Sequence, residues 1–238
     1  TFKMIVAAAA LELGLIGLND KVFCPGFYEL GSRKFHCWLK GGHGKLTLQE
    51  AILKSCDVYF YELARKVGVK RIGAMARLLG LGQSYNLPLT GLSKGFVPTK
   101  KWKKERFGTS WLVGDTLNVG IGQGFSLATP LQLAVMTARL ASGKNVSPNL
   151  IVTLDKEQNE PKNISIRKST LDAIRKGMFD VLNEKGGTAF KYRSTDENFS
   201  IAGKTGTSQV RRITREEREA GVIKNEDLPW KMRDHALF

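Results

Sequence analysis

A Lys-Thr-Gly-Thr segment near the end of the chain, Lys204–Thr207, places the strongest constraint on how this sequence can fold. A Lys-Thr-Gly flanked by apolar residues is typical of one wall of a site for serine-based acyl transfer, which needs two further motifs. Both are present upstream in the required order, because Lys3 begins a predicted helix and Ser55-Cys56-Asp57 opens another. The fold must therefore bring a first helix, a helix junction and a late strand together around one site.

Lys3 is a candidate general base. A lysine three residues after a nucleophile on a helix lies on the same face, where a neutral amine can take the hydroxyl proton. We therefore expect a nucleophilic serine immediately before Thr1, and we expect the chain without it to be inactive alone. Each motif also has an ordinary structural interpretation. Lysine is common near helix starts, Ser55 and Asp57 are residue types that cap helices, and Lys204 can be an edge-strand lysine.

Length and charge limit the classes of function. A chain of 238 residues with 42% hydrophobic residues can bury a substantial core. Its net charge of +15 favours anionic partners such as an anionic membrane surface or a pyrophosphate-bearing substrate. We find no nucleic-acid-binding signature and expect no nucleic acid partner. No uncharged apolar run is long enough to span a membrane.

The order of predicted elements indicates an α+β domain over residues 1–238, truncated at both ends. Capping residues and helical spacing predict helices over 3–18, 47–54, 57–67, 69–80, 129–141 and 171–183. Short strands are expected over 201–204 and 235–238, with a strand pair over 152–165. Residues 82–115 are predicted to form an extended surface segment, and residues 208–233 a charged mobile loop with some local helix.

The three motifs in this order resemble the transpeptidase domain of class B penicillin-binding proteins, specifically the elongation-type branch called penicillin-binding protein 2. Ser-x-x-Lys, Ser-x-Asn and Lys-Thr-Gly are the active-site motifs of that superfamily, which includes the serine β-lactamases. Further segments match in family order over nearly the whole chain: Trp38–Gly44, Ser55–Tyr61, Gly114–Asp115, Val119–Gly124, Thr129–Gln132, Gly186–Ala189 and Gly203–Gln209. The resemblance implies a penicillin-binding, serine β-lactamase-like fold. In it a helical lobe packs on a five-stranded antiparallel sheet whose last strands lie outside this chain.

The resemblance assigns roles to the residues of the first two motifs. Lys3 is implied to be the general base for the serine expected before Thr1. Ser55 is implied to relay protons or to assist the leaving group. Asp57 departs from the asparagine that many relatives carry, a substitution associated with the penicillin-binding protein 2 branch, so its role is less defined by the resemblance.

The third motif is implied to form the opposite wall. Lys204 would hold positive charge in the site, and Thr205 would bind the carboxylate of a substrate or of a β-lactam. Gly206 has no side chain, which leaves room for a substrate strand alongside. The backbone N–H of Thr207 would form one half of an oxyanion hole, and the expected serine would supply the other half.

The implied reaction is peptidoglycan cross-linking in cell-wall elongation. A serine attacks the D-Ala-D-Ala bond of a stem peptide, D-alanine leaves, and an amine of a second stem resolves the acyl-enzyme. The implied partners are stem peptides, β-lactams, a membrane glycosyltransferase and elongation-complex proteins, the last two through parts outside this chain. The implied location is the periplasmic face of the bacterial inner membrane, and no organic cofactor is expected.

Three cysteines and one histidine form a second group: Cys24, Cys37, His43 and Cys56. Three thiolates and an imidazole make a closed tetrahedral set that suits structural zinc, and some penicillin-binding protein 2 relatives resemble this in carrying zinc in the same region. Such a zinc would not be catalytic, because four protein ligands leave no open position. A Cys24–Cys37 disulfide, or three unrelated packed thiols, is the alternative, and His36 is the rival ligand nearby.

Two further functions stay open from the sequence. One is a β-lactamase or a β-lactam sensor, although these are generally shorter between the motifs and lack the charged segment after Lys204. The other is a non-catalytic, zinc-stabilised module that scaffolds the cell-wall machinery. Acylation by a penicillin separates the enzyme from the scaffold.

Overall fold

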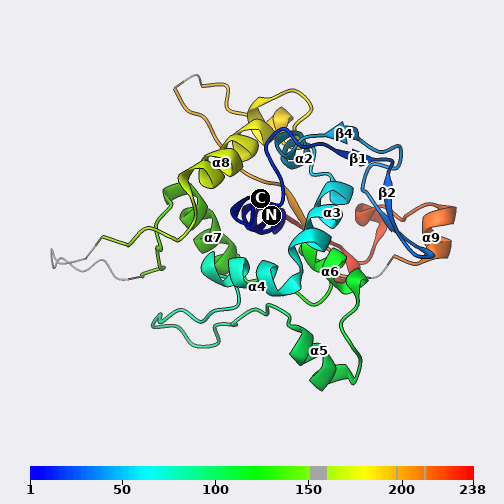
Figure 1. Ribbon diagram of the computed structural model, residues 1–238, viewed down its shortest axis with the longest axis horizontal. Coiled ribbons are helices and arrows are strands. Elements are labelled where there is room, and N and C mark those ends of the chain that lie inside the picture. Colours follow the sequence, from blue (N-terminus) through cyan, green and yellow to red (C-terminus); the bar gives the residue numbers. More distant parts are fainter. Residues whose placement is uncertain (151–159, 197, 212) are drawn as a thin grey trace.

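The computed structural model describes residues 1–150, 160–196, 198–211 and 213–238, and it has helices arranged around one buried helix with short antiparallel strand pairs beside them (Figure 1). The helices are α1 (Lys3–Glu12), α2 (Leu48–Leu53), α3 (Asp57–Val67), α4 (Val69–Leu78), α5 (Lys100–Phe107), α6 (Val113–Gly120), α7 (Pro130–Ser142), α8 (Lys168–Asn183) and α9 (Arg215–Ala220). The strand pairs are β1 (Val22–Cys24) with β4 (Gly44–Leu46), β2 (Phe27–Leu30) with β3 (Arg33–His36), and β5 (Gly206–Ser208) with β6 (His235–Leu237).

Helix α1 lies at the centre of the helical lobe. Its residues from Lys3 to Leu11 are all buried, and it packs against α2, α3, α4 and α8 (Figure 1). A run of four alanines, residues 7–10, lets the neighbouring helices approach closely on every side. The predicted helix over 3–18 is therefore correct in kind but too long. It ends at Glu12 because Gly14 adopts a left-handed backbone conformation with φ of 63°.

The junction between α2 and α3 positions the second motif. Thr47 and Glu50 form the predicted capping box at the start of α2. Helix α3 spans the predicted residues 57–67, and Asp57 occupies its first turn. Between the two helices Ser55 has a φ of 52°, the only positive φ of a non-glycine residue in the described ranges. A left-handed serine is strained by about 1–3 kcal/mol, and such strain gathers at functional sites.

The segment over residues 82–115 differs from its prediction, because it contains α5 and the start of α6. Local capping explains α5: the Thr99 hydroxyl accepts from the Trp102 N–H, and Gly108 ends the helix in a left-handed conformation. Helix α6 then packs on α3, where Gly120 is needed, since a Cβ there would lie 2.3 Å from the Cβ of Ala64. The charged composition of α5, and the glycines near both ends of α6, concealed the two helices.

The strand predicted over 201–204 is also misplaced. Residues 201–204 are not in a strand, and β5 begins two residues later, at Gly206. The backbone before it is bound to α8 instead, because Gly203 N–H donates to Met178 O and the Asn183 amide donates to Ile201 O. The predicted strand at the chain end is confirmed as β6, antiparallel to β5.

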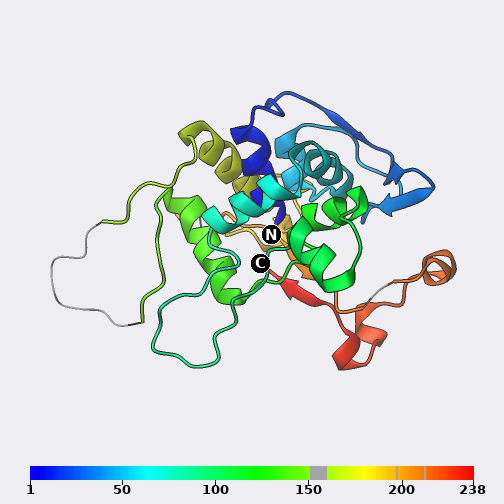
Figure 2. The same ribbon diagram turned by 60° about the horizontal axis from the view of Figure 1, so that its bottom comes forward.

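Residues 208–211 and 213–233 extend away from the helical lobe and include α9 and two short 3₁₀ turns (Figure 2). The predicted local helix is thus present, and the mobility predicted for this segment stays a prediction. The strand pair predicted over 152–165 falls mostly outside the described residues. Within the described ranges, no helix combines the length and apolar character needed to cross a bilayer.

Candidate active site

Lys3, Ser55 and Asp57 come together at the centre of the fold. The Lys3 Nζ donates to Ser55 O at 2.8 Å, to Ser55 Oγ at 3.0 Å and to Asp57 Oδ1 at 2.7 Å. These contacts use all three donors of an ammonium group. Helix α1 supplies the amine and the α2–α3 junction supplies the oxygens, so the predicted convergence of the first two motifs is present in the structure.

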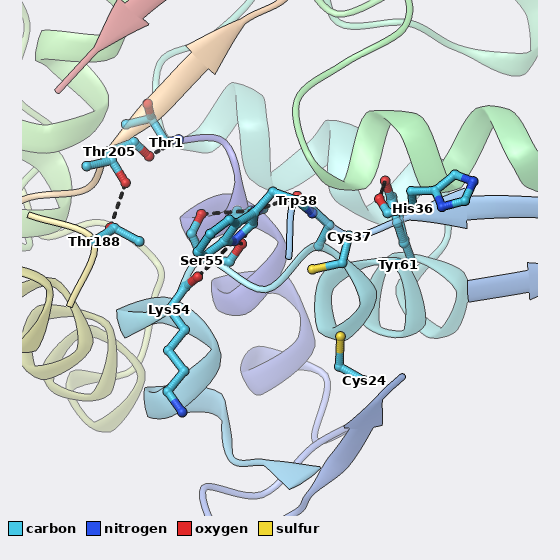
Figure 3. A network of polar contacts seen from close by, with 12 residues as sticks. Thr1, Cys24, His36, Cys37, Trp38, Lys54, Ser55, Tyr61, Thr188 and Thr205 are labelled. Atoms are coloured by element: carbon cyan, nitrogen blue, oxygen red, sulfur yellow. Dashed lines mark hydrogen bonds and ion pairs between the residues drawn. The ribbon is translucent and has the colours of Figure 1, made fainter. Parts of the chain in front are cut away.

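Asp57 is held from its other side by Trp38. The Trp38 backbone N–H donates to Asp57 Oδ2 at 2.9 Å, while its indole N–H lies 3.0 Å from Lys54 O and 3.2 Å from Ser55 O (Figure 3). One residue therefore fixes both the carboxylate and the strained backbone beside it. Asp57 can neither rotate nor move away from Lys3 without losing one of these bonds.

Lys204 and Thr205 form the opposite side of the site. Lys204 is 1% exposed, and its Nζ donates to Thr205 O at 2.9 Å and to Thr205 Oγ1 at 3.2 Å. Burial, and then repulsion by the Lys3 charge, lower the pKa of Lys204 to about 7. Its charge therefore changes near neutral pH, which an exposed lysine does not do.

Gly206 and Thr207 continue this side into β5. A Cβ at Gly206 would lie 2.6 Å from the Thr1 Oγ1, so the backbone passes close to the start of α1. Thr207 is exposed and pairs with Ala236 of β6. The last motif thus lies beside the place where the serine expected before Thr1 would be.

The cysteines and the histidine also converge. One ligand atom from each of Cys24, Cys37, His43 and Cys56 lies within 4.8 Å of the other three. The His43 Nδ1 is 3.7 Å from the Cys24 Sγ and 3.5 Å from the Cys37 Sγ. Around a tetrahedral zinc, bond lengths of about 2.0 Å to nitrogen and 2.3 Å to sulfur place these atoms about 3.6 Å apart.

All three thiols of this Cys/His cluster are buried and free, so the structure contains no Cys24–Cys37 disulfide. A hydrogen bond from Cys56 lowers the pKa of the Cys37 thiol, and the same contact together with burial raises the pKa of Cys56. Figure 3 shows Cys24 and Cys37 with their sulfur atoms turned toward each other.

Trp38 and Thr188 are site residues that our sequence interpretation did not single out. Trp38 contacts the second motif as described, and the Thr188 Oγ1 lies 2.8 Å from the Thr205 Oγ1. Both belong to segments included in the family resemblance, Trp38–Gly44 and Gly186–Ala189, so the sequence did indicate that these two segments matter. The pattern gave no reason to select either side chain.

The fold and the convergence of these side chains define an acyl-transferase domain of the penicillin-binding class. Residues 1–222 match the family model described as "Penicillin binding protein transpeptidase domain", and the chain belongs to this family. Among its curated relatives, the peptidoglycan D,D-transpeptidase MrdA of Haemophilus influenzae is 34% identical over 251 residues. That match covers 100% of this chain and 38% of the relative, so the chain spans well under half of the relative's length.

Solved structures give the same result. The structure of Pseudomonas aeruginosa PBP2 in complex with WCK 5153 has a TM-score of 0.81 and 38% identity, covering 89% of this chain and 50% of that chain. A complex between PBP2 and MreC from Helicobacter pylori gives a TM-score of 0.84 and 34% identity, and the match covers 98% of this chain and 41% of that chain. The predicted family and α+β fold class are confirmed. The roles of the individual site residues stay predictions.

Proposed function

We propose that the protein is a serine-type peptidoglycan D,D-transpeptidase that cross-links stem peptides in cell-wall elongation and is a target of β-lactams. The observation that carries this proposal is the contact of Lys3 with both Ser55 Oγ and Asp57 Oδ1, facing Lys204 and Thr205. The name of the MrdA relative supports the reaction, and the match to PBP2 structures supports the branch.

The acylation step assigns each side chain a task. The hydroxyl of the serine expected before Thr1 gives its proton to the Lys3 amine, and its oxygen bonds to the carbonyl carbon of the penultimate D-alanine. The C–N bond then breaks, and the departing D-alanine amine takes a proton relayed through Ser55. Because the Ser55 hydroxyl can accept from an ammonium or donate to an amine, its contact with Lys3 persists in both protonation states. The Thr207 N–H stabilises the oxyanion.

Fluorescent penicillin tests the proposal on a chain that includes the expected serine. We expect a stable label at that serine, because the acyl-enzyme of a transpeptidase is resolved by an amine acceptor and hydrolyses only slowly without one. Rapid loss of the label with hydrolysed penicillin would favour the β-lactamase alternative. No label at all would favour a scaffold and contradict the proposed function.

We further propose that Cys24, Cys37, His43 and Cys56 hold one structural zinc ion. The convergence of the four ligand atoms within 4.8 Å of one another and the burial of the three free thiols support this choice over unrelated thiols. When bound, zinc would fix the segment that carries Trp38 against the start of α3, where Asp57 lies, so its effect on the site would be indirect. Metal content below about half an equivalent in reduced, metal-replete protein would contradict this proposal.

We propose that the whole protein acts at the periplasmic face of the inner membrane, with its anchor and partner-binding parts outside this chain. One similar solved structure is the complex of PBP2 with MreC, and another is of a peptidoglycan synthase complex. These structures support association with an MreC-type partner and membership of a complex that polymerises and cross-links peptidoglycan. Fractionation of cells that express the whole protein checks the location.

The charge of Lys204 leads to a prediction about pH. Because its pKa is about 7, Lys204 is a cation below that pH and loses its charge above it. The second-order rate constant of acylation reports the ionisation of the free enzyme. If the Lys204 cation attracts the substrate carboxylate, its contribution to this rate constant falls as pH rises through about 7. We expect this fall in stopped-flow measurements of acylation by benzylpenicillin.

Lys204→Arg is the matched variant, because arginine stays charged over the whole range. Dividing the wild-type profile by the variant profile cancels the titration of groups that residue 204 does not influence. We expect this ratio to be flat below about pH 7 and to fall about tenfold per pH unit above it. A ratio independent of pH would show that the Lys204 charge does not govern acylation.

A further inference from the structure

Thr188 lies outside the three motifs but contacts the third one directly. Its Oγ1 is 2.8 Å from the Thr205 Oγ1, and this bond joins the loop after α8 to the segment before β5 (Figure 3). The Thr205 oxygen also accepts from the Lys204 Nζ at 3.2 Å. Thr205 therefore has two polar neighbours before any substrate arrives.

The hydrogens of these groups determine what Thr205 can do. A threonine hydroxyl has one proton and two lone pairs. If Thr205 donates its proton to Thr188, nothing remains for a substrate carboxylate. If Thr188 donates instead, Thr205 accepts from both Thr188 and Lys204, and its own proton is free for the carboxylate. Hydrogen bonds in such a chain strengthen one another, so Thr188 would make Thr205 a better donor.

The backbone holds Thr188 firmly in this position. The Thr188 N–H donates to Leu53 O at the end of α2, and the next N–H, of Ala189, donates to Val181 O in α8. The preceding residue must be glycine, because a Cβ at Gly187 would lie 2.3 Å from Val181 O. Gly187 and Ala189 therefore fix where the Thr188 hydroxyl lies relative to Thr205.

We propose that Thr188 is a positioning residue for recognition of the substrate carboxylate, and that it acts by donating its hydroxyl proton to Thr205. This inference rests on the proposed function, because it assumes that Thr205 binds the carboxylate of a stem peptide or β-lactam. In the resting site the Thr205–Thr188 bond can run in either direction. With a carboxylate bound, it runs from Thr188 to Thr205.

The test is acylation by benzylpenicillin of a chain that includes the expected serine. Thr188→Val keeps the shape but removes the donor. We expect it to raise the dissociation constant of the noncovalent complex about three- to tenfold and to change the acylation rate constant less than about twofold. The reason is that the carboxylate contact is made equally before and during attack. Thr188→Ser, which keeps the hydroxyl, is expected to restore both constants to within about twofold.

A double-mutant cycle separates this role from a merely structural one. In a Thr205→Val background, Thr188→Val is expected to have less than about a twofold further effect. An effect of equal size in both backgrounds, or no effect of Thr188→Val in the wild type, would overturn the inference while leaving the proposed function intact. Absence of any wild-type acylation would overturn both.

Discussion

Replacing Lys3 with methionine is expected to lower the acylation rate constant for penicillin by about a hundred- to ten-thousand-fold, the usual contribution of a general base. The Lys3 amine contacts both Ser55 and Asp57, so its loss also removes the group that connects them. The measurement is stopped-flow acylation by fluorescent penicillin, on a chain that includes the serine expected before Thr1.

Lys103→Met is the control for the structural cost of this change. The side chains of the Lys103–Asp115 ion pair are 9% and 17% exposed, against 8% and 14% for Lys3 and Asp57. Removing either lysine leaves a buried carboxylate without its cation, which costs about 3–5 kcal/mol of stability. Lys103→Met is expected to destabilise the protein to a similar degree but to keep its acylation rate constant. Equal loss of acylation in both variants would mean that Lys3 is only structural.

Replacing Cys24 with serine is expected to remove zinc and lower the melting temperature by about 8–16 °C. An ion present at a thousandfold excess over its dissociation constant stabilises the folded state by about 4 kcal/mol. For a chain of this size, each kcal/mol corresponds to about 2–4 °C. Differential scanning calorimetry measures the melting temperature, and metal analysis of the same samples measures the zinc content.

His36→Asn is the matched control for this variant, because His36 is near the Cys/His cluster in sequence but is not part of it. It is expected to keep one equivalent of zinc and an unchanged melting temperature. A chelator should lower the wild-type melting temperature to that of Cys24→Ser and leave the variant unaffected. Zinc retained by Cys24→Ser, or lost by His36→Asn, would show that the ligand set is wrong.

Local patterns were enough to predict the elements that carry the second motif. Thr47 with Glu50 starts α2, and apolar spacing from Asp57 to Gly68 defines α3 at its observed bounds. These signals act within a few residues, so they do not depend on the rest of the fold. The Cys/His cluster was predictable for a different reason, because few residue types bind metal and this chain has only three cysteines.

Contacts between distant residues could not be predicted in the same way. The Trp38 N–H reaches Asp57 only because the segment after β3 folds back onto the α2–α3 junction. The Thr188–Thr205 bond depends on where α8 ends relative to β5. The prediction of a strand at 201–204 was wrong for a related reason. The backbone there hydrogen-bonds to α8, so β5 begins only at Gly206.

The central position of α1 has a consequence for how the protein loses its chemistry. Proteins open locally at exposed segments at low free-energy cost, whereas a fully enclosed helix exchanges its amide hydrogens only when the whole unit unfolds. Lys3 is in such a helix, surrounded by α2, α3, α4 and α8. Opening of the peripheral segment 208–233 would therefore leave the amine and its oxygen partners in place. Loss of the base and loss of the fold are one cooperative event.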